Sequence, residues 1–282
     1  MAQTEWVAER LRAAGHTVRL VEVVTTGDRW SVGGADATKG LFVKELEEAL
    51  LDGRADLAVH SAKDLPGELP GGLGVIAIPE RQDPRDALIG APGGLAALAS
   101  GARVGTGSPR RAAQLGALRP DLTFAEIRGN VGTRLDKMAR GEVDALVLAM
   151  AGLARLGLCP PDTTPLEVEE SVPAPGQGAL ALEGRGDRAE LVAAAGPLDD
   201  PQTHVAVRAE RALLAGLGGG CREPVGAFGR TGEDGRLRLV AFAQDPDTGQ
   251  VVRDALDGPP DAPEDLGEAL AERVRRRLTE RT

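Results

Sequence analysis

The chain has 282 residues, of which 42% are hydrophobic and 27% charged, ordinary values for a globular protein with room for two or three domains. A net charge of −10 and an aromatic content of 2% argue against a general nucleic-acid binder, which needs a basic face and stacking rings. No stretch approaches the roughly 20 apolar residues of a membrane helix, and the start lacks the pattern of a secretory signal. With 2 cysteines and no disulfide framework, we expect a cytoplasmic protein.

Short apolar strands alternate with helices through the first two thirds of the chain. In chain order we predict a helix over 4–14, a strand beginning at Val18, a Gly-rich loop over 30–38, a helix over 41–51, and strands over 57–59, 75–78, 87–89, 102–105, 123–127 and 145–149. A helix is expected after each of the last three strands. This alternation favours mostly parallel sheets. Residues 53–57 and 141–145 echo one another, each closing a helix and opening a strand, which predicts two similar α/β lobes.

From residue 205 the pattern changes. A helical face beginning at Val205 runs into a glycine-rich loop that ends at Cys221. Two strands over 237–243 and 250–255 flank a hairpin turn, and a final helix is expected from 264 to about 281. These elements predict a smaller α+β domain at the carboxyl end of the chain.

Arginines recur around the turns that follow strands, at Arg110, Arg111, Arg128, Arg134 and Arg155. Ser108 is a candidate N-cap, with Pro109 at the first helical position, so the first of these arginines fall in the first turn of a helix. A helix start disfavours cations, so the arginines are either solvated surface charges or the lining of an anion site. Their repetition favours the anion site, although charge alone does not separate phosphate from carboxylate.

Asp64 is a candidate for proton transfer. It follows the buried strand 57–59 and stands beside Lys63, which would help to hold a carboxylate ionised. The alternative is that Asp64 only caps the turn before a proline. The three histidines lack the spacing of zinc ligands, so we expect no metal site.

The two cysteines differ in their surroundings. Cys221 follows three glycines and precedes Arg222, in a loop where a backbone can approach a ligand closely. A nearby cation favours a reactive thiolate, but a buried structural cysteine is the common alternative. Cys159 lies just before two prolines, and we interpret it as structural.

Seven segments occur together, and in this order they resemble the hydroxymethylbilane synthase (porphobilinogen deaminase) family. They are 39–45 (KGLFVKE), 60–66 (HSAKDLP), 80–87 (ERQDPRDA), 110–111 (RR), 128–135 (RGNVGTRL), 175–179 (PGQGA) and 219–221 (GGC). Because they span nearly the whole chain, the resemblance is highly specific.

The resemblance implies an α/β fold of three domains: two lobes like those of periplasmic binding proteins and a smaller α+β C-terminal domain. The implied boundaries are 1–80 with 178–197 for domain 1, 84–173 for domain 2, and 201–282 for the domain that carries the cofactor-attachment cysteine. The family normally opens with a strand before the first helix. This chain begins inside that helix, so we expect the strand to be missing, through an upstream start or a true truncation.

The resemblance implies a transferase of porphyrin, tetrapyrrole and heme biosynthesis. Four porphobilinogen molecules would be condensed head to tail, with release of ammonia, on a covalent dipyrromethane primer, before hydrolytic release of hydroxymethylbilane. A monomer that binds only this small-molecule substrate is expected. The alternatives are a non-catalytic bilobal binding protein for a small dicarboxylate and an inactive truncated paralogue.

The same resemblance assigns roles to individual residues. It attaches the dipyrromethane to Cys221 and gives acid–base catalysis to Asp64 with Lys63. The implied cofactor contacts are Lys63, Asp64, Thr106, Ser108, Arg110, Arg111, Arg128 and Gly129. The implied substrate contacts are Phe42, Ser61, Arg128, Arg134, Arg155 and Gln177.

Overall fold

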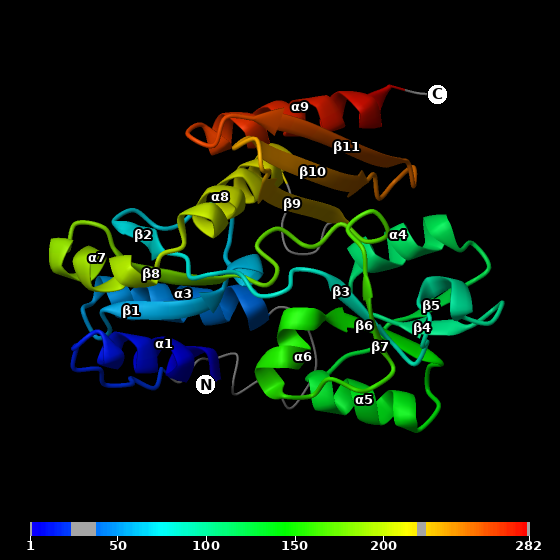
Figure 1. Cartoon of the computed structure of the whole chain (residues 1–282), viewed down its shortest axis with the longest axis horizontal. Helices are drawn as coiled ribbons and strands as arrows, with labels where there is room; N and C mark the ends of the chain where they lie inside the picture. Colours follow the sequence, from blue (N-terminus) through cyan, green and yellow to red (C-terminus); the bar gives the residue numbers. More distant parts are fainter. Residues whose placement is uncertain (1, 24–37, 219–223, 281–282) are drawn as a thin grey trace. The chain divides into compact units, whose positions relative to one another are not determined.

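The computed structural model describes residues 2–23, 38–218 and 224–280 (Figure 1). The chain divides into two compact units, each described by itself. Unit 1 comprises Met1–Arg81 and Ala179–His204, and unit 2 comprises Gln82–Gly178 and Val205–Thr282. No helix in the described ranges is both long and apolar enough to cross a membrane.

Unit 1 is built on a three-stranded sheet in the order β1-β8-β2, with antiparallel pairs throughout. One face of the sheet packs against apolar side chains of α1 and α7, including Val7, Leu11 and Ala195. Helix α3 contacts all three strands. The elements are α1 (Ala2–Ala13), α3 (Thr38–Leu51), β1 (Leu57–Ser61), η1 (Ala62–Asp64), β2 (Leu73–Ala77), β8 (Leu180–Arg185), α7 (Ala189–Ala195) and η3 (Gly196–Leu198).

The first part of unit 2 is a five-stranded sheet in the order β5-β4-β6-β3-β7. Its strands are buried on both faces: Leu146 and Leu148 of β6 face one apolar cluster, with α5 and α6, while Val147 faces another, with α4. The elements are β3 (Asp86–Ile89), η2 (Leu95–Ala97), β4 (Arg103–Gly105), α4 (Pro109–Leu118), β5 (Thr123–Ala125), α5 (Val131–Ala139), β6 (Ala145–Ala149), α6 (Met150–Leu156) and β7 (Thr163–Leu166).

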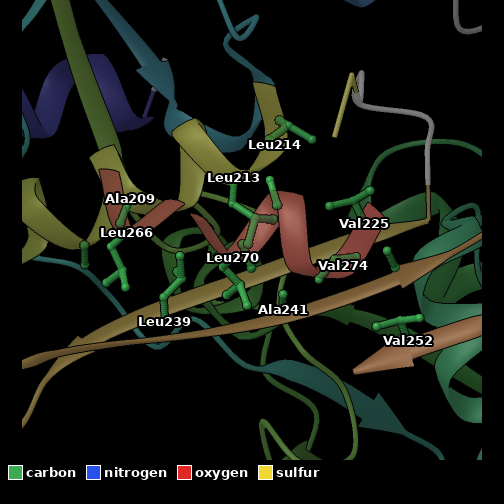
Figure 2. Close-up of a cluster of buried hydrophobic side chains, with 14 of the residues drawn as sticks. Ala209, Leu213, Leu214, Val225, Leu239, Ala241, Val252, Leu266, Leu270 and Val274 are labelled. Atoms are coloured by element: carbon green, nitrogen blue, oxygen red, sulfur yellow. The ribbon is translucent and has the colours of Figure 1, made fainter. Parts of the chain in front are cut away.

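The rest of unit 2 is an antiparallel sheet in the order β11-β10-β9, with helix α9 along it (Figure 1). Figure 2 shows how aliphatic side chains of α8 and α9, among them Leu213 and Leu270, pack over Leu239 of β10 in the core. The elements are α8 (Pro201–Gly216), whose first turn, up to His204, belongs to unit 1, and β9 (Val225–Thr231), β10 (Leu237–Gln244), β11 (Val251–Gly258) and α9 (Pro263–Thr279). The hairpin and the final helix that the sequence predicts are confirmed.

The repeat detected in the sequence has a structural counterpart in the two units. Gly53 follows α3 and precedes β1, and Gly141 follows α5 and precedes β6. Both glycines have a left-handed backbone, with φ of 69° and 75°, the conformation that ends a helix at low cost only for glycine. The same sequence signal therefore ends a helix and starts a strand in both lobes.

The α/β class is confirmed, but two structural expectations are wrong. Residues 16–23 have no regular secondary structure, so within the described residues no strand begins at Val18. The sheets are not mostly parallel: β4 runs parallel to β5 and β6, whereas β3 runs antiparallel to β6 and β7. In unit 1 the unpredicted strand β8 lies between β1 and β2, antiparallel to both. The predicted loop over 30–38 lies, up to residue 37, outside the described residues.

Candidate active site

The predicted arginine pair lies at the start of α4 in unit 2. The helix begins at Pro109 with Ser108 at the N-cap position, as predicted. The side chains of Arg110 and Arg111 are only 4% and 8% exposed, so they are not solvated surface charges. They converge on the carboxylate of Asp86, at the first position of β3, which is fully buried.

Asp86 is shared by both guanidinium groups. Arg110 Nη1 donates to Asp86 Oδ2 at 2.8 Å and Nη2 donates to Oδ1 at 3.1 Å. Arg111 Nε donates to Oδ1 at 2.9 Å, and Ser171 Oγ donates to Oδ2 at 2.7 Å. Burial raises the pKa of Asp86, but the attraction of the two arginines outweighs burial and holds this pKa well below its usual range.

The remaining donors of the arginine pair are directed at backbone and amide oxygens of the protein. Arg110 Nη1 donates to the carbonyl of Val172 at 2.5 Å, and Arg111 Nη1 donates to the carbonyl of Val147 at 2.9 Å. Gln177 is buried beside them and donates from Nε2 to Asp86 Oδ1 at 2.9 Å. Two cations and one carboxylate leave this buried group with a net positive charge.

Arg128 and Arg134 flank the turn that leads into α5. Arg128 is half exposed and lies 2.6 Å from the carboxylate of Glu126. Arg134 Nε donates to the carbonyl of Gly129 at 2.7 Å. Asn130 caps the helix by accepting a hydrogen bond from the backbone N–H of Thr133 at 2.8 Å. This turn therefore presents two cations around a capped helix start.

Arg155 differs from the expectation in its position on its helix. Helix α6 begins at Met150, directly after β6, so Arg155 lies in the last turn, where the helix dipole favours a cation. Its Nη2 donates to the carbonyl of Gly178 at 2.6 Å. Within the described residues no carboxylate pairs with Arg155, and partial burial lowers its pKa. An anion supplied by a ligand would satisfy this guanidinium.

The predicted acid–base residue lies in a turn of unit 1. Strand β1 runs directly into the short helix η1, which contains Lys63 and Asp64. The backbone N–H of Ala62 donates to the carbonyl of Ala179 at 3.0 Å, which ties the turn to the start of β8. Ser61, Lys63 and Asp64 are all partly exposed, so a ligand can reach them.

The other predicted residues are distributed as follows. Thr106 is buried after β4, and its Oγ1 accepts a hydrogen bond from the backbone N–H of Ser108 at 3.2 Å. Cys221 lies outside the described residues, as does the side chain of Phe42, whose backbone belongs to α3.

Sequence reasoning missed Asp86 as the shared counter-ion of the arginine pair. The sequence feature that could have indicated this role is a carboxylate at the first position of an apolar strand.

A family model described as "Porphobilinogen deaminase, dipyromethane cofactor binding domain" matches residues 1–193, and the C-terminal domain of porphobilinogen deaminase matches residues 204–276. The chain belongs to the porphobilinogen deaminase family. The porphobilinogen deaminase of Roseiflexus sp. (strain RS-1) is 49% identical over 280 residues, 97% of this chain and 91% of the relative. That of Acidothermus cellulolyticus is 50% identical over 278 residues, 96% of this chain and 83% of the relative.

The residues present fit the dipyrromethane cofactor of the porphobilinogen deaminase family in the chemistry of their donors. Dipyrromethane carries carboxylates on each ring, and planar guanidinium groups are the preferred partners of carboxylates. In unit 2, Arg110 and Arg111 share a single carboxylate, and Arg155 has none among the described residues. This surplus of positive charge suits a polycarboxylate ligand.

Proposed function

We propose that this chain is an active porphobilinogen deaminase, also called hydroxymethylbilane synthase. It condenses four porphobilinogen molecules head to tail with release of ammonia and then releases hydroxymethylbilane by hydrolysis. Both family domains match along the chain, which supports this function. The structural observation that carries the proposal is the surplus of buried and half-buried arginine charge in unit 2, because each added substrate unit brings further carboxylates.

The arginines bind the carboxylates of the ligand directly or attract them through their positive charge. Arg155 donates to the carbonyl of Gly178 and pairs with no carboxylate among the described residues, so its charge is available to a carboxylate of the ligand. Arg128 and Arg134 offer cations at the partly exposed start of α5. Arg110 and Arg111 contribute buried positive charge that Asp86 only partly cancels. The substrate and cofactor contacts are completed by Phe42, Ser61, Lys63, Thr106, Ser108, Gly129 and Gln177.

Asp64 acts as the general acid and base, with Lys63 beside it in the same turn. The carboxyl group gives a proton to the departing amine and recovers one at a later step. General acid–base catalysis of this kind accelerates a reaction by about 10²–10⁴-fold. The attachment of the turn to β8 through Ala62 and Ala179 holds this carboxyl group in place. Cys221 holds the cofactor through a thioether. When bound, the dipyrromethane supplies the pyrrole end to which substrate is joined.

The enzyme works as a cytoplasmic monomer on a small-molecule substrate, without nucleic acid or a membrane. The net charge of −10 supports this part of the proposal, because it opposes binding to phosphate backbones and anionic lipid surfaces.

Cofactor attachment is tested by intact-protein mass spectrometry. The wild-type protein, produced in a host that makes porphobilinogen, should carry the added mass of one dipyrromethane. Cys221→Ser should lose this mass, because the thioether cannot form. Cys159→Ser is the matched control and should keep it, because Cys159 is an exposed cysteine in a different part of the chain. An unmodified wild-type protein that binds a dicarboxylate reversibly would instead indicate a non-catalytic binding protein.

The role of Asp64 is tested by turnover. Asp64→Asn should keep the cofactor mass and lower kcat on the order of 10²–10⁴-fold, because the amide cannot exchange the proton. Asp52→Asn is the control, since this aspartate is exposed at the end of α3 and should leave kcat unchanged. Ammonia release from porphobilinogen is the measurement. Near-normal turnover in Asp64→Asn would remove Asp64 from its proposed role.

A further inference from the structure

Unit 1 buries three ionisable side chains that the proposed reaction does not use. Glu47 of α3, His60 of β1 and Glu183 of β8 are 7%, 6% and 0% exposed. In the antiparallel ladder Ala58 is opposite Glu183, so His60, two residues further along β1, shares the same face of the sheet. Helix α3, which carries Glu47, packs against these strands. We call these three side chains the buried acid cluster.

The polar atoms of the buried acid cluster lie close together but are poorly satisfied. His60 Nε2 lies 2.9 Å from Glu183 Oε2, yet neither atom makes a hydrogen bond of good direction. Glu47 Oε1 and Glu183 Oε1 also have no hydrogen-bond partner among the described residues. Ionised carboxylates only accept hydrogen bonds, whereas a protonated carboxyl group also donates one. Protons held within the cluster are therefore what can satisfy these atoms.

The charges around the buried acid cluster do not balance if both carboxyl groups ionise. Within the described residues, neither Glu47 nor Glu183 pairs with a lysine or arginine. The other charged residues on the same elements are Lys39, Lys44, Glu45 and Glu48 of α3 and Arg185 of β8, while β2 has none; the side chain of Lys39 lies outside the described residues. Lys44 and Glu48 are exposed, and Arg185 is bound to Asp187. Among the described side chains, a protonated His60 would offset only one carboxylate, so a second buried carboxylate would be uncompensated.

We propose that Glu47, His60 and Glu183 form a proton-holding cluster in which Glu47 is the neutral acid, and that this cluster positions the turn that carries Asp64. The inference rests on the proposed function, in which Asp64 acts on the substrate. The three side chains are positioning residues, because they act through the turn and not on the reacting atoms. Burial first, and then repulsion from Glu183, raise the pKa of Glu47 against the attraction of His60, which agrees with a neutral acid.

The link from the buried acid cluster to the turn is short. His60 is followed at once by Ser61 and then by the turn, and its backbone is opposite Ala181 in β8. The contact of His60 with Glu183 therefore fixes β1 against β8 at the point where the turn begins. Ionisation of Glu47 would set two carboxylates against each other between α3 and β8. That repulsion would loosen the ladder next to Asp64.

The protonation state is tested with Glu47→Gln, which keeps the shape of the acid and cannot ionise, and with exposed Glu48→Gln as the control. Because the folded-state pKa of Glu47 is raised from 4.5, the wild type should lose stability as the pH rises from 4.5 to the raised pKa. Glu47→Gln cannot ionise at this position and should not lose this stability. The difference in urea midpoint between Glu47→Gln and wild type should therefore increase over this pH range, while the difference between Glu48→Gln and wild type should stay constant. A Glu47→Gln curve parallel to that of wild type would overturn the proposal.

The positioning role is tested on the cofactor-loaded enzyme. In the wild type kcat should fall as Glu47 ionises, whereas Glu47→Gln should keep its kcat over the same pH range, with KM within about twofold. Identical kcat–pH profiles in the two proteins would overturn the positioning role. Asp64→Asn is measured alongside. Normal turnover in that variant would contradict the proposed function of Asp64, but it would leave the urea curves of Glu47→Gln unchanged, so the two failures are distinguishable.

Discussion

At the scale of single residues, the arrangement around Asp86 explains how two adjacent arginines can be buried. A buried guanidinium without a partner is strongly unfavourable, and two beside each other also repel. Asp86 receives hydrogen bonds from Arg110, Arg111, Ser171 and Gln177, so its carboxylate is satisfied as an anion. The arginine pair keeps a net positive charge only because this one carboxylate makes its burial tolerable.

Replacement of Asp86 by asparagine tests this arrangement. Asp86→Asn should lower the free energy of unfolding near pH 7 by about 3–5 kcal/mol, because it leaves two buried cations uncompensated. The folded-state pKa of Asp86 is depressed, so its contribution is present above about pH 3.9, the unfolded value, and is lost as the pH falls. The difference in free energy of unfolding between wild type and Asp86→Asn, measured by urea unfolding, should therefore become smaller below about pH 3.9. Glu167→Gln, which removes an exposed partner of Arg85, is the control and should cost about 0–1 kcal/mol.

At the scale of secondary-structure elements, the sequence predicted most of the strands and helices but not how the strands pair. Runs such as 145–149 are apolar on both faces, which marks a buried strand without showing its direction. Strand β8 was missed because residues 180–185 end in Glu183, Gly184 and Arg185, which do not resemble a buried strand. Its insertion between β1 and β2 depends on a long-range return of the chain, which local periodicity does not encode.

The connection into β8 depends on Gly178. This glycine has a φ of 89°, and a Cβ atom there would collide with the carbonyl oxygen of Gln82 and lie 3.2 Å from Pro84 Cα. Gly178→Ala should therefore lower the free energy of unfolding by more than about 1 kcal/mol, through backbone strain together with the collision. It should also raise KM for porphobilinogen, because Gly178 supplies the carbonyl that holds Arg155. Gly186→Ala, at a position with open space, should change neither measurement. Equal stability of the two variants would contradict this account.

At the scale of the whole molecule, the sequence predicted the kinds of residue in the candidate site better than their partners. The arginines and Asp64 could be named because charge at strand ends and the family motifs both point to them. That Arg110 and Arg111 are buried could not be predicted, because their partners Asp86, Ser171 and Val172 come from distant segments. Partners of this kind are set by the tertiary fold, and a list of charged residues does not contain them.

Within unit 2 a chain of hydrogen bonds joins the C-terminal sheet to the arginine pair. Arg253 of β11 donates to the carbonyl of Glu169 at 2.5 Å and to Gln114 Oε1 at 2.9 Å. Gln114 is fully buried and exchanges two hydrogen bonds with the backbone of Val172, whose carbonyl also accepts from Arg110. The C-terminal sheet therefore helps to hold the segment against which the arginine pair is packed.

Arg253→Leu should loosen this connection while leaving the C-terminal core intact. Because the arginine makes charged hydrogen bonds to groups that would be left without their donor, we expect a loss of about 1.5–3 kcal/mol in the free energy of unfolding. Hydrogen exchange should accelerate at the amide of Val172, which is bonded to Gln114, more than in α9. Arg238→Leu, on the same sheet but in an exposed pair with Asp257, should cost about 0–1 kcal/mol and leave that amide protected. Equal protection of Val172 in both variants would show that the C-terminal sheet does not support the arginine pair.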